Sequence, residues 1–142
     1  MGIVIKPTSK LLINSSLWYL WLNQEFVYVG DAGIVEPSGK SERFGLDLGL
    51  RYQLTDNLFF TSDATVTKAR SLEAISGEDF IPLAPNFTMA GGLSMTKMGN
   101  FSGSFNYRYL GDRPANEDNS IVAKGYFLLD AVINYTQPKY EI

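Results

Sequence analysis

The feature that most constrains this chain is a strict alternation of apolar and polar side chains between Arg43 and Leu54. Large apolar residues occupy every second position from Phe44 to Leu54, and charged residues, an amide or glycine stand between them. Successive side chains of a β-strand point to opposite faces, so this pattern predicts a strand with one apolar and one polar face. A helix with this sequence would scatter its leucines around its whole circumference.

The same period of two recurs along the rest of the chain, although Trp18, Leu20 and Leu22 blur the polar side of the first long segment. The predicted long strands cover residues 11–26, 43–54, 58–67, 87–96, 101–109 and 124–135. They have about 10 to 15 residues each, whereas strands of soluble proteins usually have about 5 or 6 and a tilted membrane-crossing strand needs about 9 to 11. Strand length therefore favours an antiparallel barrel that crosses a membrane.

Short and long connections alternate between these segments. The short ones are rich in turn formers and cover residues 7–10, 55–57, 99–100 and 137–139. The long ones cover residues 27–42, 71–84 and 111–123. Bacterial barrels have short turns on the periplasmic side and long loops outside. Aromatic residues such as Tyr19, Trp21 and Tyr109 also lie toward the strand ends, as in the girdles at membrane interfaces.

Composition excludes several classes of function. The chain has no cysteine and no histidine, so we expect no disulfide, no zinc site built on these residues, and no Ser-His-Asp relay. We accordingly expect neither an enzyme nor a cofactor. A net charge of −3 argues against a nucleic-acid partner. No apolar run approaches the roughly 18 residues of a spanning helix, while a barrel tolerates the mean hydropathy of −0.05 because its strands are apolar on one side only.

Several segments resemble the barrel domain of TonB-dependent outer-membrane receptors. The stretch from Phe80 to Asn86 reads FIPLAPN and resembles the end of an outer loop followed by a descending strand. The stretch from Tyr107 to Ser120 reads YRYLGDRPANEDNS and resembles the departure from an ascending strand. The segment KGYFLLDAVINY, from Lys124 to Tyr135, resembles the strand that follows, and the likeness extends over residues 11–142.

The resemblance implies a 22-strand barrel, plugged by an N-terminal domain, that imports a scarce ligand such as a siderophore, a corrinoid, nickel or a glycan. It also implies an outer-membrane location, and coupling to the TonB complex through an N-terminal box. The chain shows no signal peptide, plug or box, and Tyr140-Glu141-Ile142 looks like the start of a strand. We therefore expect residues 1–142 to form a single fragment of the all-β, up-and-down transmembrane barrel, with about six full strands and partial strands at both ends.

The charged residues of the polar parity should face the barrel lumen, because isolated charges on a lipid face cost several kcal/mol near the midplane. These residues are Arg43, Asp47, Arg51, Asp63, Arg108, Lys124 and Asp130. They either steer the ligand and contact the plug, or form ion pairs that only solvate and stiffen the wall; the second reading is favoured for most of them. Asp47 and Arg51 lie about 13 Å apart along one strand and must pair across strands.

Ligand capture, if retained, should draw on the outer loops, because loops on a rigid scaffold supply most binding residues. The candidates are Tyr28, Asp31, Glu36, Glu78, Asp79, Asp112 and Arg113. Asp112, Glu117 and Asp118 could instead bind calcium, but their spacing does not match a calcium loop. An ordered loop that contacts lipopolysaccharide or a neighbouring loop is the favoured reading.

Two other functions remain open at this point. The chain could belong to a passive porin-like channel or a small structural outer-membrane barrel, which would have neither plug nor TonB box. It could also be a soluble, lipocalin-like binding barrel with its apolar face turned inward. A monodisperse monomer in the absence of detergent would favour the soluble barrel.

Overall fold

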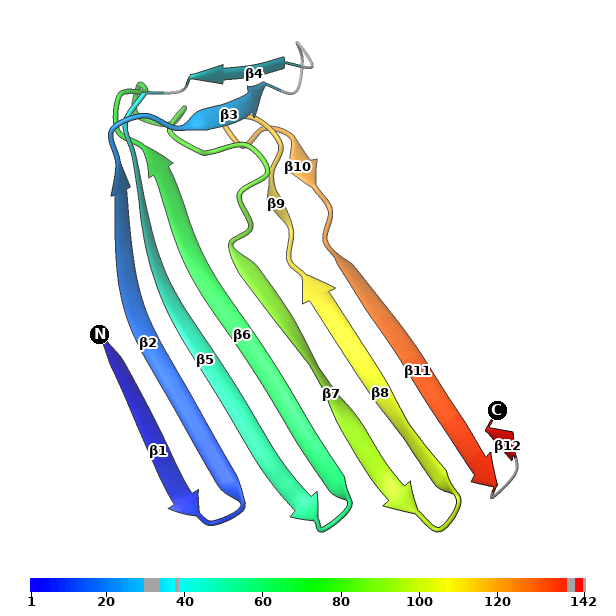
Figure 1. The fold of residues 1–142 in the computed structure, drawn as a ribbon. Coiled ribbons are helices and arrows are strands. Elements are labelled where there is room, and N and C mark those ends of the chain that lie inside the picture. Colours follow the sequence, from blue (N-terminus) through cyan, green and yellow to red (C-terminus); the bar gives the residue numbers. More distant parts are fainter. Residues whose placement is uncertain (30–33, 38, 138–139, 142) are drawn as a thin grey trace.

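A computed structural model describes residues 1–142 except 30–33, 38, 138–139 and 142. One curved antiparallel sheet of eight strands dominates it, in the order β1-β2-β5-β6-β7-β8-β11-β12 (Figure 1). The strands are β1 (Gly2–Thr8), β2 (Leu11–Leu22), β5 (Ser41–Thr55), β6 (Leu58–Ser71), β7 (Phe87–Met98), β8 (Phe101–Leu110), β11 (Tyr126–Gln137) and β12 (Tyr140–Glu141). Six long strands between two short ones confirm the predicted up-and-down partial barrel. Among the described residues, β1 and β12 form the open edges of the sheet.

The connections are sorted by length, as the sequence predicted. Tight turns join the strands at one end of the sheet, and the three long connections gather at the other end (Figure 1). Two short ladders lie within the long connections: β3 (Phe26–Val29) pairs with β4 (Ile34–Pro37), and β9 (Arg113–Pro114) pairs with β10 (Val122–Ala123). We call residues 23–40, 72–86 and 111–125 the first, second and third outer links.

The register divides the sheet into two faces, because partners in adjacent strands point to the same side. Leu46 pairs with Leu17 on β2 and with Val66 on β6, which defines the apolar face. Asp47, the next residue, pairs with Ser16 and Thr65, which defines the polar face.

The apolar face carries no layer of protein. Leu48 is 46% exposed, Leu129 54% and Ile133 75%, although all three lie within long strands. The buried hydrophobic core of the described part consists of Ala69 and Ile81, both near the outer links. A sheet with this much uncovered apolar surface requires a nonaqueous environment or another covering layer. No helix among the described residues has the length and apolarity needed to cross a membrane.

Strand boundaries differ from the predicted ones by one to four residues, and three of these differences have a clear structural cause. The strand predicted over residues 11–26 ends at Leu22, its last pairing residue, and the chain then turns into the β3–β4 hairpin. β6 continues four residues beyond the expected Thr67, because Ser71 still pairs with Ser41. β11 begins at Tyr126 rather than residue 124, since the Gly125 amide is held by a side chain of the third outer link, Asp112.

Two glycines allow large side chains to lie flat on the sheet. On the apolar face, Tyr107 reaches across Gly91 on β7, and its hydroxyl donates a hydrogen bond of 2.8 Å to the Ser62 hydroxyl on β6. A Cβ at Gly91 would lie 2.6 Å from the Tyr107 hydroxyl oxygen. On the polar face, the Trp18 ring occupies the space that a side chain at Gly45 would need. Both glycines are therefore required by close approach.

Candidate functional site

The polar face contains a charge pair that joins two neighbouring strands. Arg51 on β5 donates to both carboxylate oxygens of Asp63 on β6, at 2.9 and 2.8 Å. Both side chains are about half exposed, so the pair by itself contributes roughly 0–1 kcal/mol. Asp47 instead accepts hydrogen bonds from the Thr65 and Ser16 hydroxyls, at 2.8 and 3.3 Å. Pairing across strands rather than between Asp47 and Arg51 is confirmed.

The remaining charges predicted for this face fall into two groups. Asp130 on β11 accepts a 2.8 Å hydrogen bond from the Asn106 amide on β8. Arg108 lies on the same face and is exposed, with no hydrogen bond or ion pair among the described residues. Lys124 lies in the third outer link, before β11 begins, and is 81% exposed. The structure thus gathers the predicted strand charges on one face and leaves Lys124 off it.

A carboxylate that the sequence did not single out anchors the first outer link to the polar face. Glu25 binds the Arg43 guanidinium and also accepts a hydrogen bond from the Ser41 hydroxyl. Ser41 is fully buried, and Nε of Arg43 is buried without a hydrogen-bond partner in the described part of the chain. No local signal predicts this contact, because it forms only when the link folds back over β5.

The second outer link folds against the end of β6 and is tied to the third. Ile81 packs on Ala69, with Ala84 beside them, and this is the small buried cluster of the chain. Leu83 adopts φ of 60°, and its amide donates to the Pro114 carbonyl at 2.7 Å. The Phe80 amide likewise donates to the Glu117 carbonyl at 3.0 Å. These bonds make the two links one connected layer above the sheet.

One candidate residue of the second link is already used within the chain. Asp79 forms an ion pair of 3.0 Å with Arg70, and both side chains are more than two-thirds buried. The Arg70 guanidinium also stacks 3.9 Å above the centre of the Phe80 ring. Glu78, the neighbouring candidate, is exposed. Of the two, Glu78 has the accessible carboxylate.

The third outer link is closed by a carboxylate at its start. Asp112 accepts a hydrogen bond from the Gly125 amide at 2.7 Å and another from the Lys124 ammonium at 2.8 Å. The Gly125 amide and, next, Lys124 lower the pKa of Asp112 below its ordinary value. The same contact raises the pKa of Lys124. The ionised carboxylate therefore fixes the point at which the link enters β11.

Acid should open this closure. A group whose pKa is lowered on folding contributes stability that is present above its unfolded pKa, near 3.9, and is lost as pH falls through the folded value. We expect the amide resonance of Gly125, followed by NMR in detergent micelles, to shift with a midpoint below about pH 3.9. Asp112→Asn should abolish that transition, and a midpoint at or above the ordinary value would contradict the assignment.

The acidic tip of the third link forms a turn. Asp118 accepts hydrogen bonds from the Ser120 amide and hydroxyl, at 3.0 and 2.8 Å, and the Ser120 amide holds the pKa of Asp118 below its ordinary value. Within the described residues, no group of three or more acidic side chains is placed to hold a metal ion. The calcium reading gains no support from this geometry.

The other predicted ligand residues are distributed over the first and third outer links. Tyr28 and Glu36 lie on β3 and β4, and Asp31 falls outside the described residues. Arg113 begins β9, and its Nη1 atom is buried without a hydrogen-bond partner in the described part of the chain. Buried polar atoms without partners are rare and often mark a site for water or another bound group.

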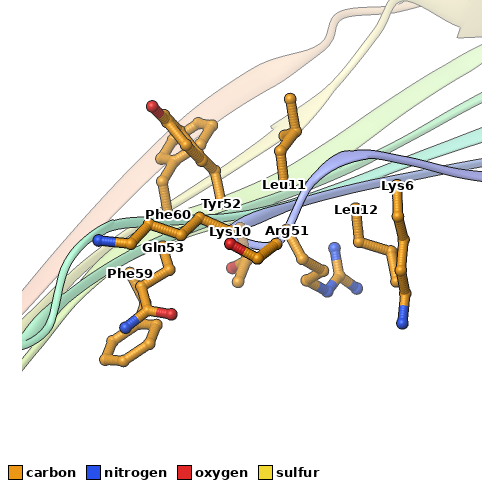
Figure 2. A pocket seen from close by; sticks show the side chains of 11 residues that line it. Lys6, Lys10, Leu11, Leu12, Arg51, Tyr52, Gln53, Phe59 and Phe60 are labelled. Atoms are coloured by element: carbon orange, nitrogen blue, oxygen red, sulfur yellow. The ribbon is translucent and has the colours of Figure 1, made fainter.

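A hollow near the tight turns shows the two faces in space. Figure 2 shows Tyr52 and Phe60 on one side of the strands, and Arg51 and Phe59 on the other. Lys6 of β1 lies on the Arg51 side (Figure 2). This open hollow combines cationic and apolar side chains and has neither an imidazole nor a thiol.

The long, uncovered strands, the division into two faces and the sorted connections define a section of a membrane-spanning antiparallel barrel wall. The family model described as "TonB dependent receptor-like, beta-barrel" matches residues 2–141. The chain therefore belongs to the TonB-dependent receptor family, as its resemblance implied, and to the bacterial outer membrane. Members of this family are transport receptors, not enzymes.

Solved structures show the same fold at low sequence identity. The ferric citrate transporter FecA in its unliganded form is 20% identical, with a TM-score of 0.75, and the match covers 97% of this chain and 23% of that one. The ferric-catecholate import receptor Fiu from Escherichia coli K12 is 18% identical, with a TM-score of 0.69, over 95% of this chain and 20% of that one. This chain spans about a fifth of those proteins. No curated protein gives a significant match.

Proposed function

We propose that residues 1–142 form one continuous section of the wall and outer rim of an energy-coupled importer for a scarce ligand. The polar face lines the lumen and the apolar face meets lipid. The family match over residues 2–141 is the observation that carries this proposal. The exposed leucines of the apolar face support its orientation, since charge on a lipid face is unfavourable.

The outer links supply the capture surface in this proposal. Arg113 of the third outer link supports it, because its guanidinium has a buried nitrogen without a partner among the described residues. Guanidinium groups bind carboxylate and phosphate oxygens well, so a ligand with anionic oxygen atoms fits them. Ferric siderophores are one such class; corrinoids and glycans are the other ligands considered. Glu78 adds an exposed carboxylate on the second link, whereas the Asp112 carboxylate is held by Gly125 and Lys124.

Energy coupling would come from the TonB complex, acting on a part of the receptor that precedes this wall section. The test is uptake of a radiolabelled ferric siderophore by cells that carry the receptor containing this segment. We expect uptake to stop when the proton-motive force is collapsed or TonB is deleted. Uptake that continues in both cases would overturn the coupling and favour a passive channel. Arg113→Gln should reduce binding about tenfold, because one charge-assisted contact is lost.

A further inference from the structure

Ionised side chains on the apolar face are confined to the ends of the strands. Among the described residues, Glu42, Lys68 and Arg70 lie on this face at the outer-link end. Lys97 lies near the tight turn of β7, where the register with β8 is irregular. Between these ends the apolar-face positions of the long strands carry no charge. The charges therefore mark the outer boundary of an apolar band.

Lys68 lies directly at the outer boundary of this band. It forms one cross-strand row with Phe44 and Tyr19, and the next row inward is Leu17, Leu46 and Val66. Phe44 is 53% and Tyr19 61% exposed. A lysine in this position lays its methylene stem along apolar surface and extends its ammonium to the polar layer.

The neighbouring charges already have partners within the chain, whereas Lys68 has none among the described residues. Arg70 pairs with Asp79 at 3.0 Å, and Glu42 accepts a 2.9 Å hydrogen bond from the Tyr19 hydroxyl. Lys68 is exposed and makes no hydrogen bond or ion pair within the part of the chain that the structure describes. Lys68 lines a hollow whose other residues include Tyr19, Glu42 and Arg70.

The chemistry of this position selects an anionic headgroup. At the outer face of a bacterial outer membrane the lipid is lipopolysaccharide, whose phosphorylated sugars lie just above its acyl chains. A cation near the membrane surface attracts such phosphates, and aromatic rings prefer the same depth. We propose that Lys68 binds a phosphate of lipopolysaccharide, with Phe44 and Leu46 against the acyl chains. This assignment rests on the proposed lipid contact of the apolar face.

Trp21 provides a local reporter for the test. It lies on the apolar face in the row of Glu42 and Arg70, next to the row of Lys68. The chain has two tryptophans, so Trp18→Phe leaves Trp21 as the sole indole. The folded 142-residue chain in detergent micelles is titrated with bisphosphorylated lipid A, dephosphorylated lipid A and phosphatidylglycerol, and Trp21 fluorescence is recorded.

Lys68→Gln should weaken binding of bisphosphorylated lipid A about fivefold, the effect of one cation near a charged surface. Lys97→Gln is the matched control, because it removes a lysine at the opposite end of the sheet and should leave affinity unchanged. Lys68→Arg should retain binding. Glu42→Gln should strengthen it, since a nearby negative charge is removed, and a purely structural role of Lys68 would not predict this gain.

Three results would overturn the proposal: equal affinity of the Lys68→Gln and Lys97→Gln variants, equal binding of dephosphorylated lipid A, or equal binding of phosphatidylglycerol. Membrane insertion of variants on the two faces tests the orientation of the wall separately. Loss of lipid A binding with normal insertion therefore separates a failure at Lys68 from a failure of the proposed wall.

Discussion

Leu48→Asp and Leu129→Asp are expected to impair insertion of the chain into liposomes strongly, whereas Asp47→Leu should affect insertion much less. Both leucines lie on the apolar face, 46% and 54% exposed, well inside long strands. A carboxylate there would face hydrocarbon at a cost of about 2 kcal/mol, which lowers the folded-to-unfolded ratio up to about thirtyfold.

Asp47→Leu is the matched control because it changes the adjacent residue on the opposite face. Loss of the Asp47 carboxylate removes the hydrogen bonds that it accepts from Thr65 and Ser16. Together these bonds contribute about 1 kcal/mol when the freed hydroxyls can reach water. Insertion is measured as protease protection and heat-sensitive gel mobility after dilution from urea into phosphatidylcholine vesicles. Equal insertion of all three variants would show that the assignment of the two faces is wrong.

The long strands could be predicted from the sequence because each of them contains its own alternation of apolar and polar residues. The alternation around Leu46, Leu48 and Leu50 reports which side is apolar without knowledge of any partner strand. Strand length and the sorting of connections are also local properties. The predicted partial barrel was accordingly confirmed, and the errors at Leu22, Ser71 and Tyr126 lie at strand ends, where pairing with a neighbour decides the boundary.

The outer rim could be predicted only as a set of candidate loop residues. Glu25 contacts Arg43 and Ser41 because the first outer link folds back over β5. The alternation of apolar and polar residues carries no information about such a fold. Asp79 was a candidate for ligand binding, yet it pairs with Arg70, a residue of the preceding strand. The sequence alone does not distinguish Lys68, because its position at the edge of the apolar face depends on how far β6 extends beyond Thr67.

Gly91→Ala is expected to destabilise the sheet by about 1–3 kcal/mol, the usual range for an extra methyl group in a closely packed position. A Cβ at this position would overlap the Thr61 carbonyl oxygen of the neighbouring strand and lie 2.6 Å from the Tyr107 hydroxyl oxygen. The Tyr107 side chain must then move away from its position across β7, and its 2.8 Å hydrogen bond to Ser62 is lost. Both hydroxyls would remain on the apolar face, where lipid offers them no partner.

Tyr107→Phe separates the two parts of this effect. It removes the hydroxyl but keeps the ring over Gly91, so we expect a loss of about 1 kcal/mol, the usual contribution of one hydrogen bond. Unfolding by guanidinium in vesicles, followed by fluorescence, gives both values and that of the double variant. If glycine is required at position 91 because neighbouring atoms lie too close for a Cβ, Gly91→Ala remains destabilising in the Tyr107→Phe background. The Thr61 carbonyl oxygen still obstructs the new methyl group there. A Gly91→Ala variant as stable as the parent chain would contradict the packing of Tyr107 across β7.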